Sequence, residues 1–271
     1  MDSVRLTISL CVLGLCALAE VFFPKRKNAY PKFKHWLGNL SLSVISTACV
    51  RFFFPLTAIR FAFIAQEKNY GIFNNFYFHP DLVLLASILL LDLIIYVQHV
   101  VFHHIPVLWK LHVVHHADKE LDVTSGIRFH PIEIMISMGI KMGAIFLFGF
   151  SPQAVLYFEI ILNATALFNH SNIHIPKKID WFLRFFLVTP DMHRVHHSTI
   201  FKETNSNFGF SLPWWDIFFK TYKKDPNLGH AQMEIGLKNY RDPKVFSLSW
   251  MLLAPFYSLR LREERQNKKS N

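Results

Sequence analysis

The sequence predicts an all-α, multi-pass integral membrane protein, and three observations carry this prediction. Of the 271 residues, 52% are apolar and only 18% are charged, with long runs that hold few charges. The formal net charge is +10, and basic residues cluster directly after apolar runs. Fifteen histidines are present, and most of them fall into tight groups. This composition excludes disordered, collagen-like and disulfide-stabilised chains, and without internal repeats or linkers we expect residues 1–271 to form a single domain.

The first expected span is the apolar run from Val4 to Phe23, whose length is about the twenty residues that a bilayer core requires. A cleaved signal peptide is the competing interpretation, because Ala17-Leu18-Ala19 resembles a cleavage site. The run continues past Ala19, however, and meets a basic segment from Lys25 to Lys34 that opposes export. A second basic segment, Arg260 to Lys269, follows the last apolar run. Both placements predict cytoplasmic segments of a membrane protein, and not a nucleic-acid-binding surface.

Two further apolar runs follow the first. Residues 37–64 are interrupted by Arg51, Pro55 and Arg60, which predicts either a kinked span or a helix followed by an interfacial segment. Residues 82–102 form a long, predominantly apolar run and predict another membrane helix.

The second half of the chain alternates apolar and polar segments. Residues 132–150 and 154–168 are apolar and are separated by Ser151-Pro152, so they are expected to form a helical hairpin. Residues 169–240 are polar and aromatic. The last apolar run, residues 246–259, is too short to span and is expected to lie at the interface or against other helices.

Ten histidines form four groups, which we call histidine boxes. Residues three and four apart lie on one face of a helix, so each box is expected to aim its imidazoles in one direction. Imidazole is the commonest metal-ligating side chain, and ten imidazoles exceed the needs of one ion. The boxes therefore predict a site for two metal ions, each with an open position. The boxes are His99 and His103; His112, His115 and His116; His170 and His174; and His193, His196 and His197.

The other histidines and the cysteines carry no such pattern. A lone histidine is more often a packed or solvated residue than a ligand, which is the role expected for His35, His79 and His230. The three cysteines lie inside apolar runs and are interpreted as small hydrophobic residues: Cys11, Cys16 and Cys49.

Acidic residues near the boxes are candidates for contacts with the ligands. Asp92 precedes His99 on one expected helix face, and Glu159 precedes His170 and His174 if their helix continues past residue 169. A carboxylate that accepts the remote ring N–H of a ligand fixes its tautomer. Pairing with an arginine inside the membrane is the alternative for both acids. Thr189-Pro190-Asp191 predicts the start of the helix that carries the fourth box, which places Asp191 beside the ligands as well.

With these boxes, residues 91–222 resemble the fatty acid hydroxylase/sterol desaturase superfamily of membrane oxygenases. The resemblance rests on the four boxes in order and on Trp109-Lys110-Leu111 before the second box. It also rests on residues 128–133 (Arg-Phe-His-Pro-Ile-Glu) after the second box, and on residues 207–209 and 215–222 after the fourth. The set identifies the superfamily, whereas it does not choose among sterol, acyl and related lipid substrates.

The resemblance implies a role for each box residue. All ten box histidines correspond to metal ligands of the superfamily. His104 is the alternative to His103, because related proteins space the two ligands of the first box by either three or four residues. His130 resembles the additional histidine that precedes a proline, for which helix capping or contact with a ligand is favoured over ligation.

The resemblance also implies the chemistry. It implies two non-haem iron ions, for which zinc can substitute, that use O₂ to hydroxylate or desaturate a C–H bond of a lipid. The second and fourth boxes lie in polar sequence outside the apolar runs, so we expect a histidine-rich cap on the basic, cytoplasmic side. Electrons must come from a separate reductase with ferredoxin or cytochrome, because the sequence has no GxGxxG, CxxC or His-Pro-Gly-Gly motif. An ether-lipid-cleaving monooxygenase is the alternative within the superfamily. A bis-histidine cytochrome and a membrane metal transporter are the alternatives from other classes.

Overall fold

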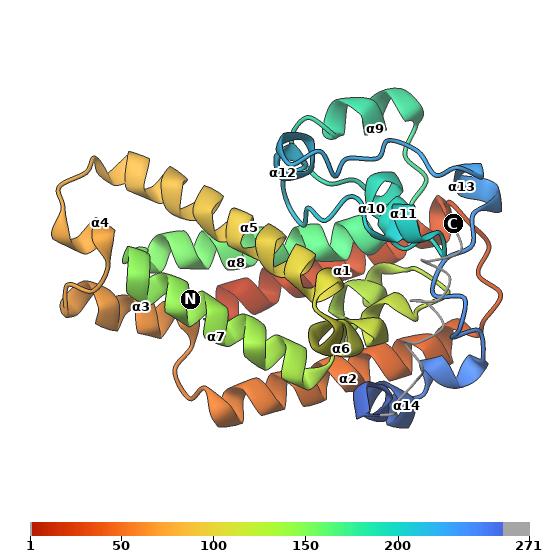
Figure 1. The fold of residues 1–271 in the computed structure, drawn as a ribbon, viewed down its shortest axis with the longest axis horizontal. Helices are drawn as coiled ribbons and strands as arrows, with labels where there is room; N and C mark the ends of the chain where they lie inside the picture. The colour runs from red at the N-terminus through yellow and green to blue at the C-terminus, as the bar shows by residue number, and fades with distance from the viewer. Residues whose placement is uncertain (1, 257–271) are drawn as a thin grey trace.

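A computed structural model of the protein describes residues 2–256, and this part of the chain is built from helices (Figure 1). It contains no strand between residues 2 and 256, only two isolated bridges, Pro24 with Ile173 and Ser198 with Ile235. The longer helices are α1 (Asp2–Phe22), α2 (Lys32–Phe53), α3 (Ala58–Glu67), α5 (Pro80–His104), α6 (Pro106–His116), α7 (Pro131–Phe148) and α8 (Pro152–His170). The shorter ones are α4 (Ile72–Asn75), η1 (Val123–Ile127), α9 (Lys177–Leu183), α10 (Pro190–His196), α11 (Phe201–Thr204), α12 (Trp214–Phe218), α13 (Gly229–Gln232), η2 (Pro243–Phe246), α14 (Leu248–Leu253) and η3 (Ala254–Phe256).

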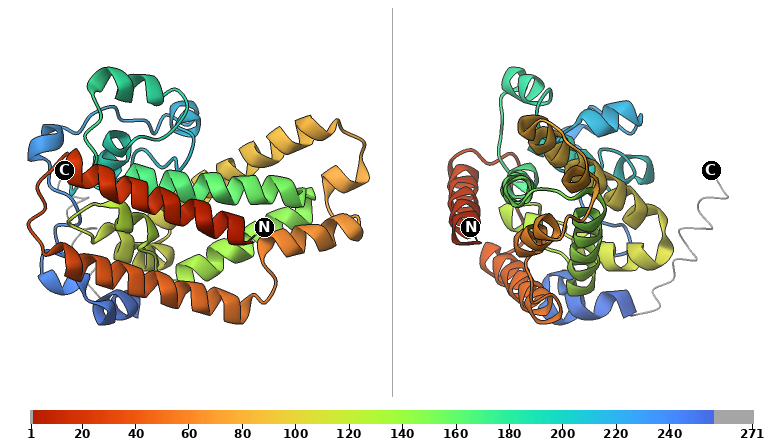
Figure 2. Two further views of the ribbon diagram at one scale, coloured as in Figure 1. Left: turned by 180° about the vertical axis from the view of Figure 1, so that it is seen from behind. Right: turned by 90° about the vertical axis from the view of Figure 1, so that its left-hand side faces the viewer.

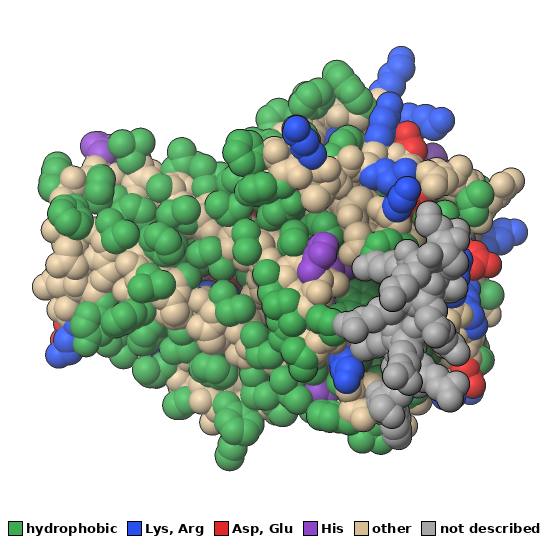
Figure 3. Space-filling model, in the orientation of Figure 1, with side chains coloured by type: hydrophobic (Ala, Val, Ile, Leu, Met, Phe, Trp, Pro, Cys, Tyr) green, Lys and Arg blue, Asp and Glu red, His purple; other side chains and the backbone are tan. Residues whose placement is uncertain are grey.

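Four helical segments are long and apolar enough to cross a membrane, which confirms the predicted fold class. Most of their residues are not buried inside the protein, so their apolar side chains face outward. Hydrophobic side chains cover the end of the molecule that the long helices form, whereas Lys and Arg side chains gather over the opposite end (Figure 3). The segments are Ser3–Phe22, Lys32–Asn75, Pro80–His104 and Pro131–Phe148.

The long helices run in alternating directions, and this brings distant segments together at one end of the bundle. α1 and α5 end there, and α2 and α7 begin there (Figures 1 and 2). α6, η1 and α9–α12 form a cap at this end, and α8 runs back into it from the opposite end. The four histidine boxes lie on the elements of this end, and the links at the other end carry none of them.

The interrupted run of residues 37–64 forms two helices. α2 ends at Phe53, the chain turns at Pro55, and the Thr57 hydroxyl accepts the backbone N–H of Arg60 at the start of α3. The face of α3 that carries mostly alanine side chains is buried in the main hydrophobic core between α5, α7 and α8, and Ala62 is fully inaccessible. A helix followed by a separate segment is therefore nearer to the structure than a single kinked span. The second helix, α3, packs within the bundle, however, and not along its surface.

The remaining apolar runs also form helices. α7 ends at Gly149, whose φ of 73° is the left-handed conformation that glycine adopts without strain. Ser151 then caps α8, which runs antiparallel to α7, as the Ser151-Pro152 break predicts. η2, α14 and η3 pack against α2 and α6, in agreement with the prediction for residues 246–256. Residues 257–259 and the basic segment Arg260 to Lys269 lie outside the described residues.

Candidate metal centre

Nine of the ten box histidines converge in two adjacent groups. Within each group, one nitrogen from every imidazole lies within 4.8 Å of the others. All nine side chains are buried except His103, which is half-buried. The first group consists of His99, His103, His112, His116 and His196, and the second of His115, His170, His193 and His197.

The second and fourth boxes each contribute to both groups. In the second box on α6, His112 and His116 point into the first group, whereas His115 points into the second. In the fourth box, at α10, His193 and His197 point into the second group, whereas His196 points into the first. The expectation that each box aims all its imidazoles in one direction is therefore wrong. Successive helical residues are about 100° apart, so the third and fourth residues after a first one lie on either side of it and can reach different ions.

Backbone carbonyls fix the orientation of several imidazoles. The Nδ1 of His99 lies 2.7 Å from the Phe208 carbonyl oxygen, and the Nδ1 of His196 lies 2.7 Å from the Ser206 carbonyl oxygen. In the second group, the Nδ1 of His170 lies 2.7 Å from the carbonyl oxygen of Ala166 on the same helix. A carbonyl can only accept a hydrogen bond, so each of these Nδ1 atoms carries the proton. The Nε2 atom of each ring is then left with a free lone pair.

A carboxylate holds a fourth ring in the same way. The Nδ1 of His112 lies 2.7 Å from Oε1 of Glu133, a side chain that is 4% exposed at the start of α7. The carboxylate accepts this N–H and raises the basicity of the opposite nitrogen. Sequence reasoning missed this contact, because Glu133 lies 17 residues beyond His116 and no helical spacing relates the two. The only signal was its place in the Arg-Phe-His-Pro-Ile-Glu segment.

The free lone pairs face one another across short distances. The Nε2 of His99 lies 3.1 Å from the Nε2 atoms of both His112 and His196. In the second group, the Nε2 of His170 lies 3.1 Å from that of His115, whose Nδ1 lies 3.3 Å from the carbonyl oxygen of Arg128. Two lone pairs repel each other and cannot form a hydrogen bond. A metal ion with nitrogen ligands at about 2.0–2.1 Å, however, holds neighbouring nitrogens about 3 Å apart, so the donor set fits two transition-metal ions.

Buried nitrogens without partners and low pKa values agree with this fit. Both ring nitrogens of His116 and Nε2 of His103 are buried without a hydrogen-bond partner among residues 2–256. Burial, and then the neighbouring imidazoles, hold the pKa of His193 and His197 well below the usual range, and burial lowers the pKa of His196 to about 3. These rings are neutral at pH 7, which is the form that ligates metal.

Two histidines near the boxes lie outside both groups. α8 ends at His170, so the expected continuation of this helix to His174 is wrong. His174 is exposed in an extended segment whose backbone N–H bonds to the carbonyl of Phe23, and the structure does not bring its ring to the centre. His104 is also exposed, with Nδ1 2.7 Å from the carbonyl of Val100, whereas His103 lies in the first group.

Three acidic residues expected beside the ligands have other partners. Asp92 accepts the indole N–H of Trp215 at 2.8 Å. Glu159 pairs with Arg5 and, at 2.7 Å, with Lys141, which agrees with the alternative of ion pairing inside the membrane. Asp191 forms ion pairs with Lys25 and Arg194.

Asp191 and His130 contact the ends of helices in the cap: Asp191 forms ion pairs at the start of α10, and His130 caps α7. Asp191 pairs with Arg194 and, at 2.6 Å, with Lys25, so it ties the basic segment after α1 to the fourth box. The start of α10 is as predicted, with Thr189 as its cap. His130 caps α7, because its Nδ1 accepts the backbone N–H of Ile132, which agrees with the capping role expected for it.

The loop of residues 206–209 is held by Asp216. Its carboxylate accepts the backbone N–H groups of Phe208 and Gly209, each at 2.8 Å. A side chain at Gly209 would place its Cβ 2.7 Å from the carbonyl oxygen of Leu212, so the loop requires glycine there. Because this loop supplies the carbonyls that orient His99 and His196, Asp216 positions ligands without touching them.

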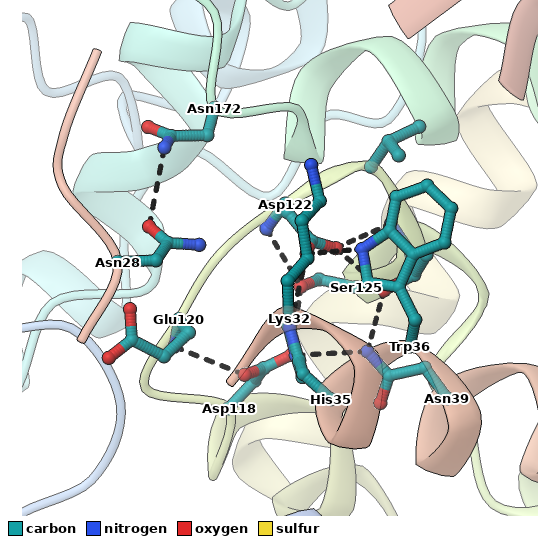
Figure 4. A network of polar contacts seen from close by, with 12 residues as sticks. Asn28, Lys32, His35, Trp36, Asn39, Asp118, Glu120, Asp122, Ser125 and Asn172 are labelled. Carbon is teal, nitrogen blue, oxygen red and sulfur yellow. Dashed lines mark hydrogen bonds and ion pairs between the residues drawn. The ribbon is translucent and has the colours of Figure 1, made fainter. Parts of the chain in front are cut away.

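A buried polar network attaches the segment after the second box to α2 (Figure 4). The ring of His35 lies between Asp118, at 2.9 Å, and Asp122, at 3.1 Å, and Trp36 donates its indole N–H to Asp122. His35 is thus a satisfied core residue. His79 is exposed, and His230 lies 3.9 Å from Asp191, away from both groups.

The fold and the centre together define a multi-pass helical membrane protein with two adjacent groups of imidazole ligands at one end of its bundle. The model of the fatty acid hydroxylase family matches residues 84–221, about half of the chain, and the chain belongs to this family. The protein is also similar to the ornithine lipid hydroxylase OlsE of Rhizobium tropici, with 24% identity over 230 residues that cover 81% of this chain and 67% of that protein. No solved structure matches the chain. The predicted superfamily resemblance is confirmed, and family and relative both indicate a lipid hydroxylase.

Proposed function

We propose that the protein is an O₂-dependent hydroxylase of a membrane lipid, with residues 91–222 as its catalytic region. One oxygen atom of O₂ enters a C–H bond of the substrate and the other leaves as water, which requires two electrons and two protons from outside the chain. The observation that carries the proposal is the opposed Nε2 lone pairs of the two histidine groups, because neutral imidazoles whose protons lie on Nδ1 cannot satisfy them. Membership of the fatty acid hydroxylase family supports the reaction type.

The two groups are expected to hold one iron ion each, for which zinc can substitute. Bound iron supplies the redox chemistry that activates O₂ towards an unactivated C–H bond. The protein's own part is to keep the imidazoles neutral and oriented. Glu133 and the carbonyls of the 206–208 segment hold the Nδ1 protons, and burial excludes water from the ligands.

The substrate is expected to be an acyl chain or a related part of a polar lipid. The relative OlsE is named an ornithine lipid hydroxylase. The outward-facing apolar helices of this chain give such a lipid access from the bilayer. A metal transporter would place its ligands near the middle of the spans, whereas the second and fourth boxes here lie on and directly after α6 and α10, at the end of the bundle (Figure 1).

The centre is expected to face the cytoplasm, where an external reductase with ferredoxin or cytochrome supplies electrons. The support for this side is the basic segment that follows α1. Lys25 in that segment forms an ion pair with Asp191 beside the fourth box, so the positive loop and the centre share one side of the membrane.

Metal analysis and lipid mass spectrometry test the proposal. Purified protein is expected to carry about two transition-metal ions per chain, and cells that make it should gain a lipid heavier by one oxygen atom. The matched control is His196→Ala, which should lose both the metal and the product. Unchanged lipids in cells that make metal-loaded protein would contradict the hydroxylase, and release of an aldehyde and an alcohol would indicate ether cleavage instead.

A further inference from the structure

Two short helices of the cap, α9 and α12, bury an acidic side chain and expose large apolar ones. In α9, Asp180 is buried while Trp181 is 61% exposed. In α12, Asp216 is fully buried while Phe218 is 75% exposed. A helix on a water-facing surface shows the opposite pattern, with apolar residues inside and polar residues outside. Neither helix belongs to the four candidate spans, so their outward apolar faces need a separate explanation.

The two helices are joined to each other in the cap. The indole N–H of Trp214 donates to the carbonyl of Phe185 at 2.7 Å, which joins the start of α12 to the turn after α9. Hydrophobic side chains gather over this part of the cap, on the side towards α5 (Figure 3). Contiguous apolar surface of this kind is unusual on water-soluble proteins and marks contact with a protein or a membrane. We call it the aromatic surface, and its most prominent residues are Trp181, Phe182, Phe186, Trp214, Ile217 and Phe218.

α12 is attached to the middle of a membrane helix and not to its end. Trp215 donates its indole N–H to Asp92 of α5, and the ring of Phe219 stacks on Tyr96 of α5 with 5.3 Å between centroids. Asp92 and Tyr96 precede the end of α5 at His104 by twelve and eight residues. At 1.5 Å per residue, the attachment lies about 12–18 Å along α5 from its end in the cap.

This attachment fixes the depth of the aromatic surface. A bilayer core of about 30 Å takes about 20 helical residues, and α5 has 25 residues, from Pro80 to His104. Every 20-residue window within these bounds contains both Asp92 and Tyr96. If α5 spans the membrane, these two side chains lie within the depth of the core, and α12 lies beside them. α12 shields the two polar groups, each 3% exposed, and turns its own apolar face outward.

We propose that the aromatic surface is embedded in the lipid of the leaflet on the side of the histidine boxes. The occupant is thus the bilayer that α5 crosses, because the surface continues the lipid-facing side of that helix. The exposed Lys177 and Lys178 at the start of α9 are placed to contact lipid headgroups, as cationic residues do beside interfacial aromatic side chains. Part of the cap is therefore inserted into the membrane. A second copy of the chain or another protein on this surface is the competing outcome of the test.

Spin-label accessibility distinguishes the three environments. A nitroxide is attached to Phe182→Cys and Phe218→Cys in the full chain, with the native cysteines replaced by alanine, and the protein is placed in lipid nanodiscs. Collisions with O₂, which concentrates in lipid, are compared with collisions with a water-soluble nickel chelate. The matched controls are Leu85→Cys, on the exposed face of α5, and Gln232→Cys, on the polar side of the cap.

The ratio of O₂ to nickel collisions at positions 182 and 218 should match the high value at Leu85 and lie well above the value at Gln232. A ratio as low as at Gln232 would place the surface in water and overturn the proposal. Low collision rates with both reagents would indicate a covering protein and would overturn it equally. A second measurement uses a chain that keeps its cysteines. If Trp181 contacts lipid, brominated acyl chains should quench its fluorescence, and this quenching should be lost in Trp181→Phe. Neither readout depends on bound metal or turnover, so failure here leaves the proposed hydroxylase untouched.

Discussion

The contact between Glu133 and His112 gives the sharpest test of the proposed metal centre. Oε1 of Glu133 accepts the Nδ1–H of His112 at 2.7 Å, and Oε2 has no hydrogen-bond partner among residues 2–256. The carboxylate therefore acts on this one ligand. Glu133→Gln keeps an oxygen acceptor of the same shape but removes its charge.

The magnitude follows from the loss of that charge. A hydrogen bond to a charged group contributes about 1.5–3 kcal/mol and one between neutral groups about 0.5–1.5 kcal/mol, so the substitution removes roughly 1–1.5 kcal/mol. At about 1.4 kcal/mol per tenfold change, metal affinity should fall about 5- to 12-fold. Glu133→Ala removes the acceptor altogether, and a loss of about 10- to 100-fold is expected, as for other groups that orient metal ligands.

Competition with a fluorescent zinc chelator on detergent-purified protein measures these affinities without turnover. The matched control is Asp92→Asn, which replaces another buried carboxylate by its amide but touches Trp215 and no histidine. It should bind metal as the unaltered protein does. Equal affinity in Glu133→Gln and the unaltered chain, or an equal loss in Asp92→Asn, would refute the assignment of Glu133.

Two further predictions concern the histidines themselves. His116→Ala should abolish lipid oxidation and lower the metal content measured by mass spectrometry, whereas His174→Ala should retain both, because only His116 lies in a ligand group; loss of metal in the His174 variant would contradict the assigned groups. The metal-free protein should become less stable as the pH falls from 7 to 5, which thermal unfolding in detergent would detect. The pKa of the His196 imidazole is about 3 in the folded chain and about 6.5 in the unfolded chain. The unfolded chain therefore takes up the proton first, and stability is lost as the pH falls below about 6.5. An unfolding temperature that stays constant between pH 7 and 5 would contradict the burial of neutral imidazoles.

Local patterns were sufficient to predict the long helices and the nine histidines that the two groups bring together. Apolar runs of bilayer length identified the spans, and the helix start at Thr189-Pro190-Asp191 was read from capping chemistry alone. The structure does not bring His174 into either group, because four-residue spacing places two side chains on one face only while the helix lasts, and α8 ends at His170. Spacing cannot reveal where a helix ends when no glycine or proline marks that position.

Contacts between segments far apart in the sequence could not be predicted in this way. Asp92 has the correct offset from His99 to support a ligand, but the helix face that it occupies is covered by α12, and the Trp215 indole takes its carboxylate. Glu133 has no helical offset from its ligand, yet the packing of α7 beside α6 brings it to His112. The partner of a buried carboxylate depends on tertiary packing, and sequence spacing constrains only partners on the same helix.

The division of two boxes between the two groups makes the metal sites interdependent. α6 supplies His112 and His116 to one group and His115 to the other, and α10 divides its ligands in the opposite sense. A rigid helix cannot move one of these rings towards its ion without moving the others. Displacement of α6 or α10 should therefore weaken both sites together, whereas the ligands of the first box, on α5, belong to one group alone. The HxxHH spacing thus couples the two groups through the geometry of single helical turns, whereas the four-residue spacing of His99 and His103 serves one group alone.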